Sequence, residues 1–377
     1  MTKLYLLDPP VDTKWAPFQA SRPLAEWRAG AWLIRERWEA VAGTSTEAVF
    51  GPPHLHAFVE EGAPPVQEQA SVEGPALIGR SDFAPAGIAP ELPSDAVRLV
   101  NDEETVGWWV PEGSTWSGDV SDGEPVELEG MLLHGAFDVI TAIEHLLAAD
   151  VADFLREPGD PIPDGSVVLG DPNDVVLLGA AVEPGVVFDT RRGAIVIEQH
   201  AYVRGGSRLE GPLFVGPGTE VLGGTIGGSA FGPRCRVRGE VGSTVFFGYA
   251  NKAHDGYLGH SVIGRWVNLG AGTTTSNLKN TYGSVRLSVG DTRLETGRQF
   301  LGSLVGDHAK TAIGTLLPTG AVIGAGANVF GAAAVPKYVA PFAWGLADER
   351  MALDGFLTTA RRVMPRRQVE VTDAVRL

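Results

Sequence analysis

The sequence predicts two architectures in one chain: an α/β domain followed by a parallel β-helix built from six-residue repeats. The length of 377 residues is enough for two or three domains. Seven of the nine tryptophans lie before residue 117, whereas glycine is concentrated after residue 165. In the glycine-rich part an apolar residue recurs at every sixth position, in three runs separated by two breaks. This spacing is typical of β-helix coils, which bury their apolar position only by stacking on one another.

Composition and charge exclude several classes of protein. The single cysteine, Cys235, excludes an internal disulfide framework and favours a reducing cytoplasm. The formal net charge of −16 argues against nucleic-acid binding. The first residues have too short an apolar run for a signal peptide, and no segment has the ~18 apolar residues of a membrane span. We therefore expect a cytoplasmic protein without nucleic-acid or membrane partners, in which a local group of arginines and lysines binds any phosphorylated substrate.

Residues 1–135 are predicted to form the α/β domain. Lys3–Leu7 has the apolar character of a first strand. A helix is expected to begin at Ser21 as N-cap, with Pro23 in its first turn, and to end at Gly43. Apolar residues fall at helical spacing between these signals. Further strands are predicted over Ala76–Gly79, Ala96–Val100 and Gly107–Pro111.

Residues 136–165 are predicted to connect the two domains. Asp138–Leu155 has apolar residues near 3.6-residue spacing, which predicts a packed helix. Glu157–Gly165 is rich in proline and glycine and is expected to be a linker.

Residues 166–345 carry the hexad repeat of the predicted β-helix. Its inward positions are expected to be Val176, Val182, Phe188, Ile197, Val203, Leu209, Val215, Val221, Ile263, Leu269, Val305, Thr311, Leu317, Ile323, Val329 and Val335. The repeat is irregular over 227–258 and 275–304, so loops are expected to leave the coils there.

Residues 346–377 are predicted to form a C-terminal helical segment. Basic side chains gather near its end, namely Arg361, Arg362, Arg366 and Arg367. They complement the helix dipole. Both a solvated basic face and a contact to the phosphates of a ligand are consistent with this pattern.

The segment Asn251–Gly283 holds the residues that best fit a chemical role. Acyl transfer from a thioester to an amine needs a base, donors for the oxyanion and groups that hold both reactants. His254 is the predicted base, because its ordinary pKa lies near neutrality and it falls between coils. Lys252 and Lys279 are candidate phosphate ligands. The candidate partners of sugar hydroxyls are Tyr257, Asn268 and Asn277.

The stretch KAHDGYLGHSVIGRWVNLGAGTTTSN resembles the acetyltransferase segment of the bifunctional N-acetylglucosamine-1-phosphate uridyltransferase/glucosamine-1-phosphate acetyltransferase family. The resemblance implies that His254 is the catalytic base and that Tyr257, Asn268 and Asn277 contact the sugar. It implies that Ser303, in Phe-Leu-Gly-Ser, contacts acetyl-CoA. It further implies a left-handed β-helix, a homotrimer, and coenzyme A in the groove between adjacent subunits. In place of the family's Asn-Tyr-Asp-Gly, this chain has Asn-Leu-Lys-Asn around Lys279.

The front domain resembles a divergent branch of the same sugar nucleotidyltransferases. The matching segments are SRPLAEWRAG (21–30), IRERW (34–38) and, near the C-terminus, the arginine-rich segment 361–367. The resemblance implies a Rossmann-like, nucleotidyltransferase-like α/β domain that would use UTP and Mg²⁺ to make a UDP-sugar.

One departure bears on that front-domain activity. Ordinary members have a glycine-rich loop after the first strand, whose N–H groups hold a triphosphate. This chain has Asp8-Pro9-Pro10 there, and proline has no N–H. Arg22 and Arg28 are the candidate nucleotide ligands instead, with Asp8 or Asp102 as candidate Mg²⁺ ligands.

The function predicted from the sequence is acetyl-CoA-dependent N-acetylation of an amino-sugar phosphate, with nucleotidyl transfer by the front domain left open. Two alternatives belong to other classes. A β-helix carbonic anhydrase would need His254, His260 and His308 to converge on zinc. A non-catalytic trimeric scaffold would carry a degenerate front domain.

Overall fold

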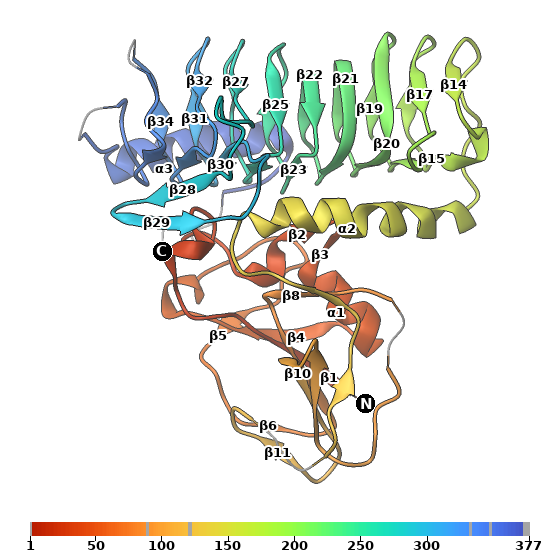
Figure 1. The fold of residues 1–377 in the computed structure, drawn as a ribbon, viewed down its shortest axis with the longest axis vertical. Helices are drawn as coiled ribbons and strands as arrows, with labels where there is room; N and C mark the ends of the chain where they lie inside the picture. Colours follow the sequence, from red (N-terminus) through yellow and green to blue (C-terminus); the bar gives the residue numbers. More distant parts are fainter. Residues whose placement is uncertain (1, 88–89, 120–122, 332–333, 347–348, 372–377) are drawn as a thin grey trace. The chain divides into compact units, whose positions relative to one another are not determined.

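The computed structural model describes residues 2–87, 90–119, 123–331, 334–346 and 349–371. The chain divides into two compact units. The front unit contains Met1–Asp12 and Gln19–Gly135, and the second unit contains Thr13–Phe18 and Ala136–Thr372. Figure 1 labels the elements of both units.

A seven-stranded mixed sheet forms the centre of the front unit, in the order β12-β9-β10-β7-β1-β4-β5. Strand β1 pairs in parallel with both β4 and β7, whereas β10 is antiparallel to β7 and β9. The strands are β1 (Lys3–Leu7), β4 (Thr46–Phe50), β5 (Val66–Gln67), β7 (Ala76–Arg80), β9 (Val97–Asn101), β10 (Glu104–Val110) and β12 (Val126–Glu127). Two short pairs accompany the sheet: β6 (Val72–Glu73) with β11 (Thr115–Trp116), and β8 (Phe83–Pro85) with β13 (Gly130–Leu132). The strands predicted from the sequence are confirmed.

The helix predicted after Ser21 is only half right. Helix α1 covers Ile34–Ala42 and ends at Gly43, which adopts the left-handed conformation with φ 65°. Before it the chain forms a 3₁₀ turn over Leu24–Glu26 and a tight hairpin of β2 (Arg28–Ala29) and β3 (Trp32–Leu33). Gly30, with φ 70°, makes the hairpin turn. The apolar residues that suggested a helix here are buried as expected, but in a turn and a hairpin.

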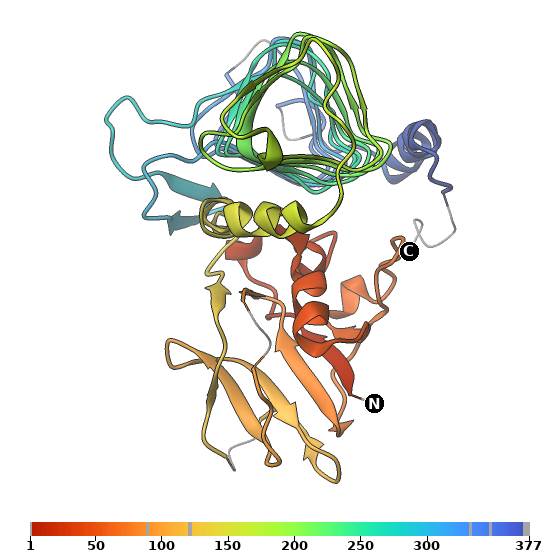
Figure 2. The ribbon, with the colours of Figure 1, turned by 90° about the vertical axis from the view of Figure 1, so that its right-hand side faces the viewer.

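The second unit is a left-handed parallel β-helix, as predicted, with three faces. Figure 2 looks along it and shows the stacked, roughly triangular coils. Face A is formed by β16 (Ala181–Val182), β19 (Tyr202–Val203), the first residues of β21 (Glu220–Phe231) and β22 (Arg236–Gly242), β24 (Asn251–Lys252), β31 (Lys310–Thr311) and β34 (Asn328–Val329). Face B includes β14 (Val167–Leu169), β17 (Val187–Asp189), the first half of β20 (Ser207–Val215), β25 (Tyr257–Gly259), β27 (Thr274–Thr275) and β32 (Leu316–Leu317). Face C includes β15 (Val175–Leu177), β18 (Ile195–Ile197), β23 (Val245–Phe246), β26 (Val262–Ile263), β30 (Leu304–Val305), β33 (Val322–Ile323) and β35 (Tyr338–Val339).

The hexad positions form the interior of this β-helix. Phe188, Val203, Leu209, Val215 and Ile263 are among those with no exposed surface, and Val182 packs against the cluster while partly buried. Val176 is the exception: it was predicted to point into the β-helix, but it is not part of the interior cluster. It is buried, but its neighbours Val175 and Leu177 belong to the interior cluster instead.

The two irregular stretches of the repeat behave differently from each other. Residues 227–258 stay in the coils, contrary to the prediction. Val215 pairs with Phe231, Phe231 with Phe246 and Phe246 with Ile263, so these coils advance by 16, 15 and 17 residues. Regular coils advance by 18 residues, as between Ile197 and Val215. Shortened turns therefore disturb the six-residue spacing without ejecting a loop.

A loop does leave the β-helix between β27 and β30, as predicted. It carries the hairpin of β28 (Arg286–Val289) and β29 (Thr292–Glu295). Its Arg298 donates to Thr141 Oγ1 over 2.6 Å and to Glu144 Oε1 over 2.5 Å. Both partners lie on helix α2 (Asp138–Asp153), so these bonds anchor the loop to that helix.

Helices α2 and α3 (Leu353–Val363) flank the β-helix (Figure 2). The chain continues from α2 into a 3₁₀ turn, whose Phe154 packs its ring 5.8 Å from that of Phe214 in β20. Helix α3 is followed by the 3₁₀ turn η6 (Met364–Arg367). Within the described parts of the chain, no helix combines the length and apolarity that crossing a membrane requires.

Candidate functional site

A row of polar side chains runs along the outside of face A. Arg236 is in register with Asn251, Asn251 with Asn268, and Asn268 with Lys310. Parallel strands in register place such side chains about 4.8 Å apart. The Asn251 amide donates to Asn268 Oδ1 over 2.8 Å. The row is therefore a continuous polar strip across four coils.

The turn from face C to face A forms one side of this strip. Tyr249 and Trp266 occupy equivalent positions in successive coils, both with left-handed backbone, and their rings stack at 4.4 Å. His308 and Phe342 continue the same turn in later coils. Phe356 of α3 packs edge-on against both, at 5.3 and 5.2 Å, and so holds α3 along this turn.

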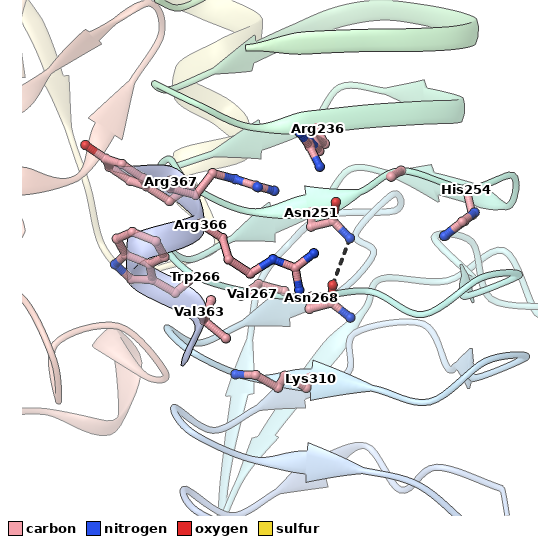
Figure 3. A pocket seen from close by; sticks show the side chains of 12 residues that line it. Arg236, Asn251, His254, Trp266, Val267, Asn268, Lys310, Val363, Arg366 and Arg367 are labelled. Carbon is pink, nitrogen blue, oxygen red and sulfur yellow. Dashed lines mark hydrogen bonds between the residues drawn. The ribbon is translucent and has the colours of Figure 1, made fainter. Parts of the chain in front are cut away.

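The C-terminal segment completes a groove of about 450 Å³ over the strip. Arg234 donates to the backbone oxygen of Arg367 and ties η6 to the β-helix. Figure 3 shows Arg366 and Arg367 reaching from this segment over the face that carries Asn251 and Asn268. The groove ends at His254, in the turn from face A to face B.

Four cationic side chains line the groove: Arg236, Lys310, Arg366 and Arg367. Arg236 donates to Glu220 over 2.8 Å, but its Nε is buried without a hydrogen-bond partner among the described residues, and so is Arg367 Nε. Burial and, secondly, the charge of Arg236 lower the pKa of Arg367. Buried donors and like charges at one place favour a bound anion.

Lys310 lies at the far end of the strip. Burial lowers its pKa to about 8, and its ammonium donates to the backbone oxygen of His308 over 2.8 Å. It is thus a cation at neutral pH that has lost much of its hydration.

His254 is exposed at its turn, while Lys252 holds that turn from beneath. Lys252 is 1% exposed and donates to the backbone oxygens of Arg238 and His254. Burial lowers its pKa to about 8. The prediction that Lys252 binds phosphate is therefore wrong: its ammonium is committed to the backbone of the turn that carries His254.

Tyr257 and Asn277 lie together on face B, away from the groove. Asn277 Nδ2 lies 2.7 Å from Tyr257 Oη and 2.9 Å from His260 Nδ1. Burial raises the pKa of Tyr257. Of the predicted sugar-contacting residues the groove thus contains Asn268 alone.

Two further predicted residues do not reach the groove. Lys279 lies in the loop after β27 and donates to the backbone oxygen of Ser284 over 3.0 Å. Ser303 has no exposed surface. Its hydroxyl pairs with that of Thr275 at 2.7 Å, inside the β-helix. A coenzyme has no access to the Ser303 side chain, which corrects the role implied by the resemblance.

Within one chain, the three histidines of the zinc alternative do not come together. His254, His260 and His308 occupy three different turns, after β24, β25 and β30 respectively. The described residues contain no group of three or more His, Cys, Asp or Glu that could hold a metal ion.

The candidate nucleotide ligands of the front unit are engaged internally. Arg22 is 1% exposed and pairs with both carboxylate oxygens of Glu60, at 2.7 and 3.2 Å. Arg28 is buried and donates to the backbone oxygen of Ala31. Asp8 and Asp102 follow β1 and β9, which β10 and β7 separate in the sheet, so they lie roughly 14 Å apart at ordinary strand spacing. Arg22 and Arg28 are thus engaged within the front unit. That Asp8 or Asp102 binds Mg²⁺ stays a prediction.

Sequence patterns did not single out Arg236, Asn251 or Lys310 as site residues. The signal that would have found them is their spacing relative to Asn268: residues one coil apart on face A must align once the coil length is known.

Two curated proteins are similar to part of the chain. A bifunctional sugar-1-phosphate nucleotidylyltransferase/acetyltransferase of Sulfurisphaera tokodaii is 36% identical over 100 residues, which are 26% of this chain and 25% of that protein. The bifunctional protein GlmU of Methanococcus vannielii is 30% identical over 115 residues, 30% of this chain and 26% of that protein. The matches span about a quarter of the length of these relatives. No family model matches the chain. The similarity supports a relationship to bifunctional sugar-1-phosphate nucleotidyltransferase/acetyltransferases.

Proposed function

We propose that the chain is an acetyl-CoA-dependent N-acetyltransferase that acts on an amino-sugar phosphate, with the groove on face A as its site. One observation carries this proposal: the groove gathers four cations in a chain of net charge −16 and ends at an exposed histidine. Both substrates of the proposed reaction carry phosphate, and the reaction needs a proton acceptor near neutral pH. The β-helix and the names of the two relatives support the same kind of transferase.

The proposed reaction uses His254 as the base. As the amine nitrogen of the sugar attacks the thioester carbonyl carbon, His254 accepts the amine proton. The carbon–sulfur bond then breaks, coenzyme A leaves as thiolate, and the imidazolium returns the proton to it. Arg366 and Arg367 would hold phosphates of the coenzyme, and Asn268 would orient the sugar. A positioned base contributes typically ~10²–10⁴-fold to such a reaction.

A homotrimer is part of the proposal. The residues that the resemblance assigns to one site lie on different faces of this chain: His254 and Asn268 at the groove, Tyr257 and Asn277 on face B. This division is expected where a face of one subunit meets another face of its neighbour. Each site would then combine two chains.

The proposal does not extend to nucleotidyl transfer. Both relatives are named as bifunctional proteins. In the front unit of this chain, however, Arg22 and Arg28 are paired internally.

The test is a thiol-release assay with acetyl-CoA and a panel of amino-sugar phosphates. We expect turnover with at least one acceptor, and a loss of ~10²-fold or more in His254→Asn. His200→Asn is the matched control, because His200 is also an exposed turn histidine and lies several coils away. Equal turnover in wild type and His254→Asn would remove His254 from the mechanism, and absence of turnover with every acceptor would refute the proposal.

A further inference from the structure

Lys252 occupies a position that the β-helix otherwise fills with aliphatic side chains. On face A it is in register with Val237, and Val237 is in register with Val221. Both valines belong to the interior cluster and have no exposed surface. Lys252 itself is 1% exposed. Burying an ammonium group costs free energy, and this burial lowers the pKa of Lys252 to about 8. Packing of the interior therefore does not explain why a lysine stands here.

The turn that carries His254 is longer than the equivalent turn in the preceding coil. Before the turn, Lys252 is in register with Val237. After it, Leu258 is in register with Val241. The same two interior positions are thus joined by three residues in one coil and by five in the next. As in a β-bulge, the extra residues have no counterpart in the neighbouring coil, and the ladder of hydrogen bonds is interrupted there.

The Lys252 ammonium lies at this interruption. It donates to the backbone oxygen of His254 in the longer turn and, over 3.2 Å, to that of Arg238 in the shorter turn. Gly239 leaves room for it, because a Cβ atom there would lie 3.3 Å from Lys252 Nζ and 2.6 Å from the backbone oxygen of Gly256. Lys252 thus joins the two turns from inside the β-helix, where the ladder does not.

Two other contacts hold the neighbouring residue, Asp255. Arg238 donates to its carboxylate over 2.9 Å, and the N–H of Gly272 donates to its backbone oxygen over 3.1 Å. The Arg238 side chain is 37% exposed and that of Asp255 is 76% exposed, and ion pairs this exposed contribute little. The buried ammonium of Lys252, in contrast, holds the peptide group of His254 itself.

We propose that Lys252 is a positioning residue for acyl transfer: its ammonium fixes the backbone of His254 and thereby directs the imidazole toward the groove on face A. The inference rests on the proposed function, in which His254 is the base. Lys252 acts through His254 and touches no substrate, because its ammonium is enclosed in the β-helix. A base must lie within hydrogen-bond reach of the proton that it accepts, so a turn that wanders loses rate.

The first experiment is steady-state thiol release by Lys252→Met, which keeps nearly the length of the side chain and removes its donors. We expect kcat to fall about 10- to 100-fold. The KM for acetyl-CoA should change by less than about twofold, because Arg366 and Arg367 of the groove are untouched. Val203→Ala is the matched control. It weakens the interior of face A several coils away, so it should lower the melting temperature and leave kcat unchanged.

The second experiment measures the His254 turn by NMR relaxation and does not depend on turnover. The backbone N–H of His254 should have an order parameter near ~0.85 in the wild type and below ~0.6 in Lys252→Met. Val203→Ala should keep the wild-type value. If Lys252→Met does not fold, the wild type labelled with ¹⁵N at lysine decides: Nζ protons of Lys252 that exchange slowly with water support the inference, and fast exchange overturns it.

Three further results would overturn the inference: equal kcat in wild type and Lys252→Met, an order parameter of His254 that the substitution leaves unchanged, or an equal fall of kcat in Val203→Ala. The last result would mean that a general loss of stability lowers the rate. Absence of thiol release in the wild type would instead refute the proposed function. The order parameters then still show whether Lys252 fixes the turn, so the two failures are distinguishable.

Discussion

Arg236 and Arg367 bring two guanidinium groups to one groove, and each has a buried Nε without a hydrogen-bond partner among the described residues. One comes from face A of the β-helix and the other from the C-terminal segment, 131 positions later in the sequence. Like charges repel, so placing the two guanidinium groups at one groove costs free energy in the ligand-free protein. An anionic ligand between them would offset that cost.

Replacing Arg367 with glutamine should therefore weaken ligand binding more than it affects the fold. A hydrogen bond to a charged group contributes about 1.5–3 kcal/mol, so we expect coenzyme A to bind roughly 10- to 100-fold more weakly. Thermal stability should remain equal or rise, because the repulsion from Arg236 is removed. Titration calorimetry and a melting curve measure both quantities. Arg362→Gln, an exposed arginine of α3, is the control; equal losses in both variants would contradict a specific role.

The affinity for a phosphorylated ligand should fall as pH rises through about 8. Burial lowers the pKa of Lys310 to about 8, so this cation of the groove becomes neutral above that pH. Phosphate monoesters remain dianionic there, which leaves the loss of the lysine charge as the cause. Dissociation constants measured between pH 7 and 9 test this. Lys310→Met should bind weakly at every pH and show a flat profile, and a wild-type profile that is also flat would contradict the role of Lys310.

The free energy of unfolding of the β-helix unit should rise between pH 8 and about 10. Lys252 and Lys310 both have a pKa of about 8 in the folded chain, against about 10.4 when unfolded. In this window the unfolded chain binds more protons than the folded chain, so stability increases with pH. Denaturant unfolding at each pH, followed by the fluorescence of Trp266 after other tryptophans are replaced as needed, measures this free energy of unfolding. The double variant Lys252→Met/Lys310→Met should lose the slope; an unchanged slope would refute the assignment.

Replacing Arg298 with alanine should release the loop between β27 and β30. Its guanidinium is 15% exposed and bonds to Thr141 and Glu144 on α2. Without these bonds the hairpin of β28 and β29 loses its anchor, and limited proteolysis within 276–303 should accelerate several-fold. Arg293→Ala, in the exposed β29, is the control. Equal cleavage rates in both variants would show that the anchor has no effect on the loop.

The repeat made the β-helix predictable because its spacing is a direct consequence of coil geometry. Phe188, Val215 and Ile323 are buried inside it for that reason. The front helix was harder, because a turn and hairpin around Gly30 can bury the same apolar residues that an α-helix would. Residue type alone did not reveal that the Lys252 ammonium points inward or that Ser303 is sealed inside the β-helix. The alignment of Arg236 with Lys310 depends on shortened coils, whose lengths only the strand pairing shows.

The location of bound coenzyme A tests the central proposal most directly. We predict that a crystal structure with coenzyme A and an amino-sugar phosphate will show coenzyme phosphates at Arg366 and Arg367. Its sulfur and the amine should then lie within reach of the His254 ring. Coenzyme A bound elsewhere, with the groove on face A empty, would contradict the proposal.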